Sequence, residues 1–140
     1  MLAKDLMRRD VFTVRGDQPI GELIDLMVRE HIHGCPVVDE QDRLVGVVTQ
    51  QDIFFSEVTR AAGSGQREAP ESVTATKLKV RDLMTSPAVS VTEDAEVLEL
   101  CRMMHRLRIH RIPVVRDGKV AGIISSLDII REVARGPERL

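Results

Sequence analysis

A ten-residue pattern occurs twice in this chain of 140 residues and constrains its fold more than any other feature. VGVVTQQDIF starts at Val45, and AGIISSLDII starts at Ala121. Both stretches place a glycine and two β-branched residues before a hydroxyl residue, two spacers and an aspartate. The pattern predicts a strand that ends where a helix begins, formed twice.

The similarity continues through most of the chain in a nearly constant register, which indicates an internal repeat. Matching segments are DLM at 5–7 and 82–84, PVV at 36–38 and 113–115, and the glycines at 46 and 122. Small and polar residues separate the two copies. We therefore expect a first repeat over 1–61, a linker over 62–76, a second repeat over 77–136 and a tail over 137–140.

Each repeat has the pattern β-α-β-β-α, which predicts an α+β fold. A short helical turn leads into an extended segment, VFTV in the first repeat and AVSV in the second. Apolar residues then recur at helical spacing over 20–28 and 97–104. Two strands follow, each pair opened by a proline and joined in the second repeat by the hairpin signal Asp117-Gly118. The expected strands are 36–39, 43–49, 113–116 and 119–125.

Composition and charge argue against several classes of function. The net charge is -2 and the chain has no Trp or Tyr, so both the basic surface and the stacking platforms of a nucleic-acid binder are missing. No uncharged apolar run approaches the ~18 residues of a membrane span. The two cysteines do not form a disulfide framework. We expect a cytoplasmic protein with neither a nucleic-acid nor a membrane partner.

Catalytic and metal-binding patterns are also missing from the sequence. It has no GxxxxGK[ST] loop, no GxSxG element and no CxxC pair. Cys35 follows His33 at a spacing typical of neither a nucleophile nor a metal site, and its apolar neighbours favour an inert thiol. Arg102, Arg106 and Arg108 favour a solvated helix face. We expect no catalytic residue, no metal and no required cofactor.

The repeated hydroxyl and aspartate have two interpretations. In the first, Thr49 with Asp52 and Ser125 with Asp128 form capping boxes at the starts of helices. In the second, each carboxylate also accepts hydrogen bonds from two vicinal hydroxyls, as an acidic residue does on the ribose of dinucleotides. The same atoms serve both interpretations, so the sequence leaves the two open.

The cations near these aspartates differ between the repeats. His33 and His110 occupy matching positions just before PVV, but His33 precedes Gly34 whereas His110 precedes Arg111. A phosphate beside an aspartate needs a cation nearby because the two anions repel each other. If both repeats bind nucleotide, we expect the second to hold phosphate better.

The chain resembles a tandem pair of CBS domains, the regulatory modules first noticed in cystathionine β-synthase. The resemblance is carried by DLM…TV with IHGCPVVDEQDRLVGVVTQQDI in the first repeat and DLM…SV with IHRIPVVRDGKVAGIISSLDI in the second. It implies two β-α-β-β-α repeats packed sheet to sheet with pseudo-twofold symmetry and a cleft on either side. It also implies a homodimer that forms through the amphipathic helices.

The same resemblance implies a ligand and its binding residues. Members of the family bind adenosine-containing ligands such as AMP, ADP, ATP or S-adenosylmethionine. Carried over by position, Thr49, Asp52, Ser125 and Asp128 would hold the ribose. The other expected binding residues are Thr13, Val14, Cys35 and Pro36 with Ser90, Val91, Ile112 and Pro113 around the base, and His33, His110 and Arg111.

Two functions of different classes follow. One is a regulatory sensor of adenosine ligands, and so of cellular energy state, which acts on an unidentified effector protein. The other is a non-catalytic structural or protein-interaction scaffold whose clefts stay empty. A scaffold would not need Asp52, Asp128 and the pair His110-Arg111 together, so the sequence favours the sensor.

Overall fold

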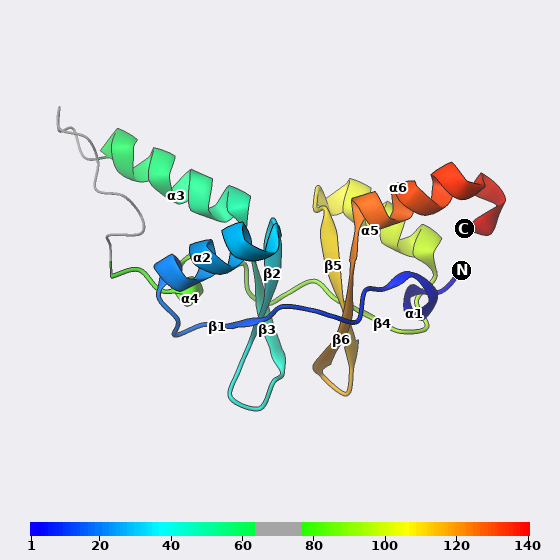
Figure 1. The fold of residues 1–140 in the computed structure, drawn as a ribbon, viewed down its shortest axis with the longest axis horizontal. Coiled ribbons are helices and arrows are strands. Elements are labelled where there is room, and N and C mark those ends of the chain that lie inside the picture. Colours follow the sequence, from blue (N-terminus) through cyan, green and yellow to red (C-terminus); the bar gives the residue numbers. More distant parts are fainter. Residues whose placement is uncertain (64–76) are drawn as a thin grey trace. The chain divides into compact units, whose positions relative to one another are not determined.

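The chain forms two compact units, each with its own three-stranded sheet (Figure 1). The computed structural model describes residues 1–63 and 77–140, without the side chains of 58–63. The N-terminal unit comprises Phe12–Gln41 and Val45–Ala88, and the C-terminal unit comprises Met1–Val11, Asp42–Leu44 and Val89–Leu140. Neither unit is continuous in sequence, so the compact units and the sequence repeats have different boundaries.

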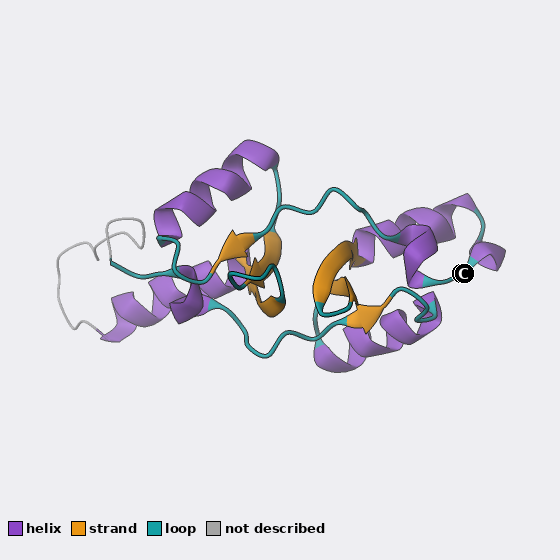
Figure 2. Cartoon of the chain, turned by 90° about the horizontal axis from the view of Figure 1, so that it is seen from below, coloured by secondary structure: helices purple, strands orange, loops and turns teal. Residues whose placement is uncertain are grey.

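In the N-terminal unit, α2 and α3 lie on one face of the sheet, whose strand order is β1-β2-β3 (Figures 1 and 2). β1 pairs with β2 in parallel, with Val14 opposite Val37. Helix α3 includes residues 62 and 63 of the expected linker, and the rest of that linker, 64–76, lies outside the described residues. The elements are β1 (Val14–Arg15), α2 (Ile20–Glu30), β2 (Gly34–Val38), β3 (Leu44–Thr49), α3 (Gln50–Gly63) and α4 (Val80–Leu83).

The C-terminal unit repeats this plan with α5 and α6 on one face of the sheet β4-β5-β6. Its parallel pair places Val91 opposite Val114. Strands β5 and β6 form the expected hairpin, and Asp117 and Gly118 have positive φ angles of 53° and 77°. The elements are α1 (Ala3–Leu6), β4 (Val91–Thr92), α5 (Val97–Leu107), β5 (Arg111–Arg116), β6 (Lys119–Ser125), α6 (Ser126–Arg135) and the 3-10 helix η2 (Pro137–Arg139).

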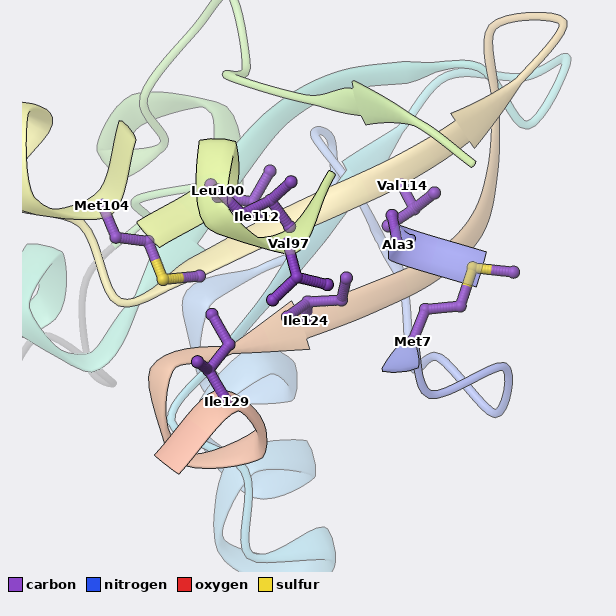
Figure 3. Packing of buried hydrophobic residues seen from close by; sticks show 9 residues of the cluster. All are labelled: Ala3, Met7, Val97, Leu100, Met104, Ile112, Val114, Ile124 and Ile129. Carbon is purple, nitrogen blue, oxygen red and sulfur yellow. The ribbon is translucent and has the colours of Figure 1, made fainter. Parts of the chain in front are cut away.

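The predicted apolar stripes form the two cores, because each helix turns one row of side chains toward its sheet. Leu23 of α2 and Leu100 of α5 are fully buried at matching positions. Figure 3 shows the core of the C-terminal unit, in which residues of α1, α5, α6 and two strands pack together. The two cores and the pattern of elements confirm the predicted α+β class.

The short helix that opens each repeat packs in the unit that contains the strands of the other repeat. Met7 follows α1 and lies against Gly122 of β6, where an added Cβ would be 2.6 Å from the Met7 sulfur. Met84 follows α4 and lies against Gly46 of β3, where an added Cβ would be 2.8 Å from the Met84 sulfur. The glycines of the repeated pattern therefore make room for these methionines.

The two prolines lie inside their strands, which differs from the predicted strand starts. β2 begins at Gly34 and β5 begins at Arg111, two residues before Pro36 and Pro113 respectively. The parallel neighbour of each strand joins only at the residue after the proline, Val37 or Val114. At the proline itself one side of the strand is still open, so the missing N–H need not break a ladder bond there.

Candidate functional site

In each unit a strand passes directly into a helix, and we call this junction a corner. The first corner joins β3 to α3 at Thr49 and Gln50 in the N-terminal unit. The second corner joins β6 to α6 at Ser125 and Ser126 in the C-terminal unit. The residues expected to hold a ribose lie at these two corners.

The capping-box interpretation is confirmed at both corners. In the first, the Thr49 N–H donates to Asp52 Oδ2 at 2.8 Å, and the Asp52 N–H donates to Thr49 Oγ1 at 3.3 Å. In the second, the Ser125 N–H donates to Asp128 Oδ2 at 2.8 Å, and the Asp128 N–H donates to Ser125 Oγ at 3.2 Å. Each hydroxyl also lies within hydrogen-bonding distance of Oδ2, at 3.1 and 2.8 Å. Capping therefore uses one oxygen of each carboxylate.

The two carboxylates differ in burial and in the use of the second oxygen. Asp128 is only 4% exposed, and its Oδ1 lies 3.5 Å from Arg131 Nη1. Asp52 is half-buried, and its Oδ1 has no hydrogen-bond or ionic partner among the described residues. The first corner thus presents an open acceptor, whereas the second presents an acceptor with an arginine beside it.

The matching histidines are held at the corners through their backbones. The Gln50 N–H donates to the His33 carbonyl at 2.9 Å, and the Ser126 N–H donates to the His110 carbonyl at 2.8 Å. Their side chains differ, because His33 Nδ1 lies 2.8 Å from Gln50 Oε1. Ser126 replaces that glutamine in the second corner, and among the described residues the exposed His110 ring has no hydrogen-bond partner.

The extended segments lie beside the proline-containing strands, as the parallel registers require. In that register Thr13 and Val14 run alongside Pro36 and Val37. The C-terminal unit repeats the arrangement with Ser90 and Val91 alongside Pro113 and Val114. The structure therefore brings these expected binding residues onto the same strand pair that carries His33 or His110 at its end.

Five of the residues expected around the base are buried inside the units, including Val14, which is 3% exposed. Cys35 is 1% exposed and Ile112 is 0% exposed, and both belong to the hydrophobic cores. Pro36 and Pro113 have fully buried side chains as well. These five side chains lie in the interior of the units, whereas His33, His110, Thr49, Ser125 and Asp52 are exposed or part-exposed at the corners.

Two corner residues were not among the sequence predictions. Gln50 fixes the His33 ring, and Arg131 lies against the Asp128 carboxylate. The sequence could have indicated both residues, because Gln50 is the first residue of a predicted helix and Arg131 lies about one helical turn after Asp128. The hydroxyl-aspartate pattern alone does not include either of them.

Within residues 1–63 and 77–140, no group of three or more His, Cys, Asp or Glu residues is arranged to hold a metal ion. The helices described there are also too short or too polar for any of them to cross a bilayer.

Known proteins contain sequences similar to both repeats, and therefore to the segments that form both corners. The CBS domain family model matches residues 3–57 and 80–135. Inosine-5'-monophosphate dehydrogenase of Methanocaldococcus jannaschii is 35% identical over 92% of this chain and 23% of that enzyme. Protein MK0525 of Methanopyrus kandleri is 32% identical over 91% of this chain and 60% of its own length. The chain therefore spans less than two thirds of either relative.

A solved structure has the same fold over nearly the whole chain. It is the CBS domain pair of protein MJ0100 in complex with 5'-methylthioadenosine and S-adenosyl-L-methionine. The TM-score is 0.78 at 27% sequence identity, and the match covers 96% of this chain and 97% of that one. The likeness agrees with the two β-α-β-β-α repeats described above.

Proposed function

Because the chain belongs to the CBS domain family, we propose that it is a non-catalytic regulatory module that binds an adenosine-containing ligand. The family model matches twice and covers both corners. In this proposal Asp52 and Asp128 hold the ribose hydroxyls, and Thr49 and Ser125 assist them. The ligand is AMP, ADP, ATP or S-adenosylmethionine.

The observation that carries the proposal is that the capping box uses only one of the two oxygens of each carboxylate. Oδ2 of Asp52 and of Asp128 is used by the capping box, which leaves Oδ1 of Asp52 open and Oδ1 of Asp128 with Arg131 Nη1 at 3.5 Å as its neighbour. A fixed carboxylate with one spare oxygen suits a pair of vicinal hydroxyls, because the capping bonds orient it before the ligand arrives. The complex of the MJ0100 domain pair with two adenosine-containing molecules supports this ligand class.

The remaining binding residues have complementary roles in the proposal. The base lies along the paired strands and is held by the backbone and accessible groups of Thr13, Val14, Cys35 and Pro36 or of Ser90, Val91, Ile112 and Pro113. His33 is already engaged by Gln50, whereas the His110 ring is exposed and the neighbouring Arg111 adds a positive charge to this corner. The second corner is therefore proposed to bind the phosphate-bearing ligand.

The regulatory step in this proposal is linkage between binding and conformation. A ligand that binds one arrangement of the module stabilises it by about 2.7 kcal/mol at a hundredfold excess over Kd. Only a difference in affinity between arrangements generates a signal. The signal is passed to an effector protein, and the module pairs with a second copy of itself. Since the chain matches only 23% of the dehydrogenase relative, the activity of that enzyme is not part of the proposal.

Calorimetry and thermal melting with AMP, ADP, ATP, S-adenosylmethionine and a guanosine nucleotide test the proposal. The informative variants are Asp52→Asn and Asp128→Asn, which keep an acceptor for the cap amide. Asp82 and Asp5 provide matched controls, because each accepts a hydrogen bond from a backbone N–H at the start of a short helix, at 2.8 and 2.9 Å. We expect an adenosine ligand to raise the melting temperature, Asp128→Asn or Asp52→Asn to abolish that rise, and Asp5→Asn and Asp82→Asn to preserve it.

A scaffold without ligand is the alternative, and one observation favours it. Both corner carboxylates already have a structural role in complete capping boxes. In that case no ligand shifts the melting temperature, and all four Asp→Asn variants simply melt at or below the temperature of the wild type. That outcome would reject the sensor and retain the scaffold.

A further inference from the structure

The second corner places two cations around its capping carboxylate. Arg131 Nη1 lies 3.5 Å from Asp128 Oδ1, and the Arg131 side chain is 61% exposed, so its guanidinium also reaches solvent. Arg111 is the strand partner of Ser125 in the β5–β6 hairpin, which brings a second arginine to the end of β6. Two positive charges therefore accompany the one negative charge of this corner.

The first corner has neither of these cations at the matching positions. Phe55 takes the place of Arg131, and Gly34 takes the place of Arg111. Asp52 Oδ1 has no ionic partner among the described residues. Both corners lie at the start of a helix, so the helix dipole acts on them alike and does not remove the difference. Counting these groups, the first corner is anionic and the second is cationic.

Phe55 is an exposed aromatic side chain beside an open carboxylate. It follows Asp52 by three residues in α3, so the two side chains share a face of that helix. Phe55 is 68% exposed and belongs to neither hydrophobic core, so packing within the unit does not account for it. The face of an aromatic ring attracts a cation, and a carboxylate does so more strongly. This pair of side chains therefore favours a positively charged ligand and disfavours a phosphate.

We propose that Phe55 and Arg131 determine the charge of the adenosine ligand that each corner accepts. The inference rests on the proposed function and adds a selectivity to it. The first corner takes an adenosine whose 5' substituent is positively charged or neutral, such as a sulfonium or a thioether, because a phosphate near Asp52 would meet no cation of this corner. At the second corner Arg131 and Arg111 offset the charge of Asp128, so a nucleotide is accepted. The module therefore responds to two classes of ligand.

Calorimetry with one corner disabled at a time tests this assignment. Asp128→Asn weakens ribose binding at the second corner and leaves the first, and Asp52→Asn does the reverse. We expect Asp128→Asn to bind S-adenosylmethionine most tightly, 5'-methylthioadenosine less tightly, and AMP at least about tenfold more weakly than S-adenosylmethionine. We expect Asp52→Asn to bind AMP more tightly than either of the other two.

Exchanging the two residues should exchange the preference. Phe55→Arg in the Asp128→Asn background should raise the affinity for AMP by about fivefold, and Arg131→Phe in the Asp52→Asn background should lower it by about fivefold. The matched control Phe54→Arg adds the same charge on another face of α3, at a side chain that is 66% exposed. It should change the affinity for AMP by less than about twofold at physiological salt. Melting curves of every variant show whether it folds.

Two results would overturn the inference while leaving the proposed function in place. One is equal affinity of Asp128→Asn for S-adenosylmethionine and AMP, and the other is a folded Phe55→Arg variant whose preference is unchanged. In both cases adenosine ligands bind, but these two positions do not select among them. If the wild type binds none of the three ligands, the proposed function fails and the selectivity fails with it, so the two failures are distinguishable.

Discussion

The N-terminal and C-terminal units share one plan but differ in the ionic contacts that matching positions make among the described residues. In the C-terminal unit Lys4 and Asp94 are 2.8 Å apart, and Glu93 receives two hydrogen bonds of 2.7 Å from Arg116. In the N-terminal unit Arg15 lies 4.0 Å from Glu40, and Arg29 lies 3.2 Å from the neighbouring Glu30. A duplicated fold therefore keeps its core and capping groups while its surface contacts diverge.

The aligned positions explain this divergence. Glu93 corresponds to Gly16 in the N-terminal unit, and Glu132 corresponds to Ser56. Glu132 is 6% exposed and binds Arg135 at 2.6 Å and Arg139 at 3.0 Å, which joins η2 to α6. The contacts of the C-terminal unit thus attach the segments at its chain ends, and the N-terminal unit has no carboxylate at the positions of Glu93 and Glu132, although Asp17 corresponds to Asp94.

The largest effects are expected at the two glycines, where the units are most alike. Gly46→Ala places a Cβ 2.9 Å from the Thr85 carbonyl oxygen, and Gly122→Ala places one 2.9 Å from the Met7 Cβ. Both distances are too short for a real contact, so each change lowers the free energy of unfolding by about 1–3 kcal/mol. Urea unfolding of both variants measures the losses.

Gly16→Ala is the matched control for this pair, because its new Cβ would lie 3.4 Å from the nearest atom. We expect this control to change stability by less than about 0.5 kcal/mol. A large loss at only one of Gly46 and Gly122 would show that the two methionine contacts are not equivalent.

The next largest losses of stability are expected at the capping aspartates, and the difference in burial between the two corners predicts that these losses are unequal. Asp128→Ala leaves the Ser125 N–H of a buried corner without its acceptor, so we expect a loss near the upper end of about 0.5–2 kcal/mol. Asp52→Ala occurs at a half-buried corner where water can replace the carboxylate, so its loss lies near the lower end. Denaturant unfolding in the absence of ligand measures both, and a larger loss for Asp52→Ala contradicts the ranking.

The features that the sequence predicted are those encoded by neighbouring residues. The helix starts at Gln50 and Ser126 follow from a hydroxyl and an aspartate three positions apart, and the hairpin follows from Asp117-Gly118. The apolar stripes predicted the buried faces of α2 and α5 because helical spacing fixes which side chains share a face. Local patterns of this kind were sufficient for the α+β class.

The features that the sequence did not predict depend on contacts between distant segments. A four-residue helix such as α1 contains too little information to specify the strand against which Met7 packs. The short distances at Gly46 and Gly122 follow from that packing and have no local signature. In the candidate site, the hydroxyl-aspartate pairs were predictable, whereas the burial of Cys35 and Ile112 depends on how each sheet meets its helices.

A smaller loss of stability is expected at acidic pH, and it arises in the C-terminal unit. Hydrogen bonds from Arg139 and Arg135 lower the pKa of Glu132 below its ordinary value of 4.5. Because this pKa is lower in the folded state than in the unfolded state, the ionised Glu132 carboxylate stabilises the unit fully above pH 4.5. This stabilisation is lost as the pH falls through the lowered pKa. Glu132→Gln should therefore destabilise the protein at pH 7 and flatten the fall in stability below pH 4.5. Melting temperatures from pH 7 to pH 3 measure this, and an unchanged acid slope contradicts it.

The smallest effect is expected at the exposed pair Lys4 and Asp94, whose side chains are 46% and 78% exposed. The hydrogen bond and the charge of Lys4 lower the pKa of Asp94, so its contribution also disappears as the solution becomes acidic. Water and salt screen such a pair strongly. Asp94→Asn should lower the melting temperature slightly at low salt and not at all in 1 M salt, whereas Asp17→Asn, the aligned change in the other unit, should have no effect at either concentration. Equal effects of the two variants would mean that the ionic contacts do not distinguish the units.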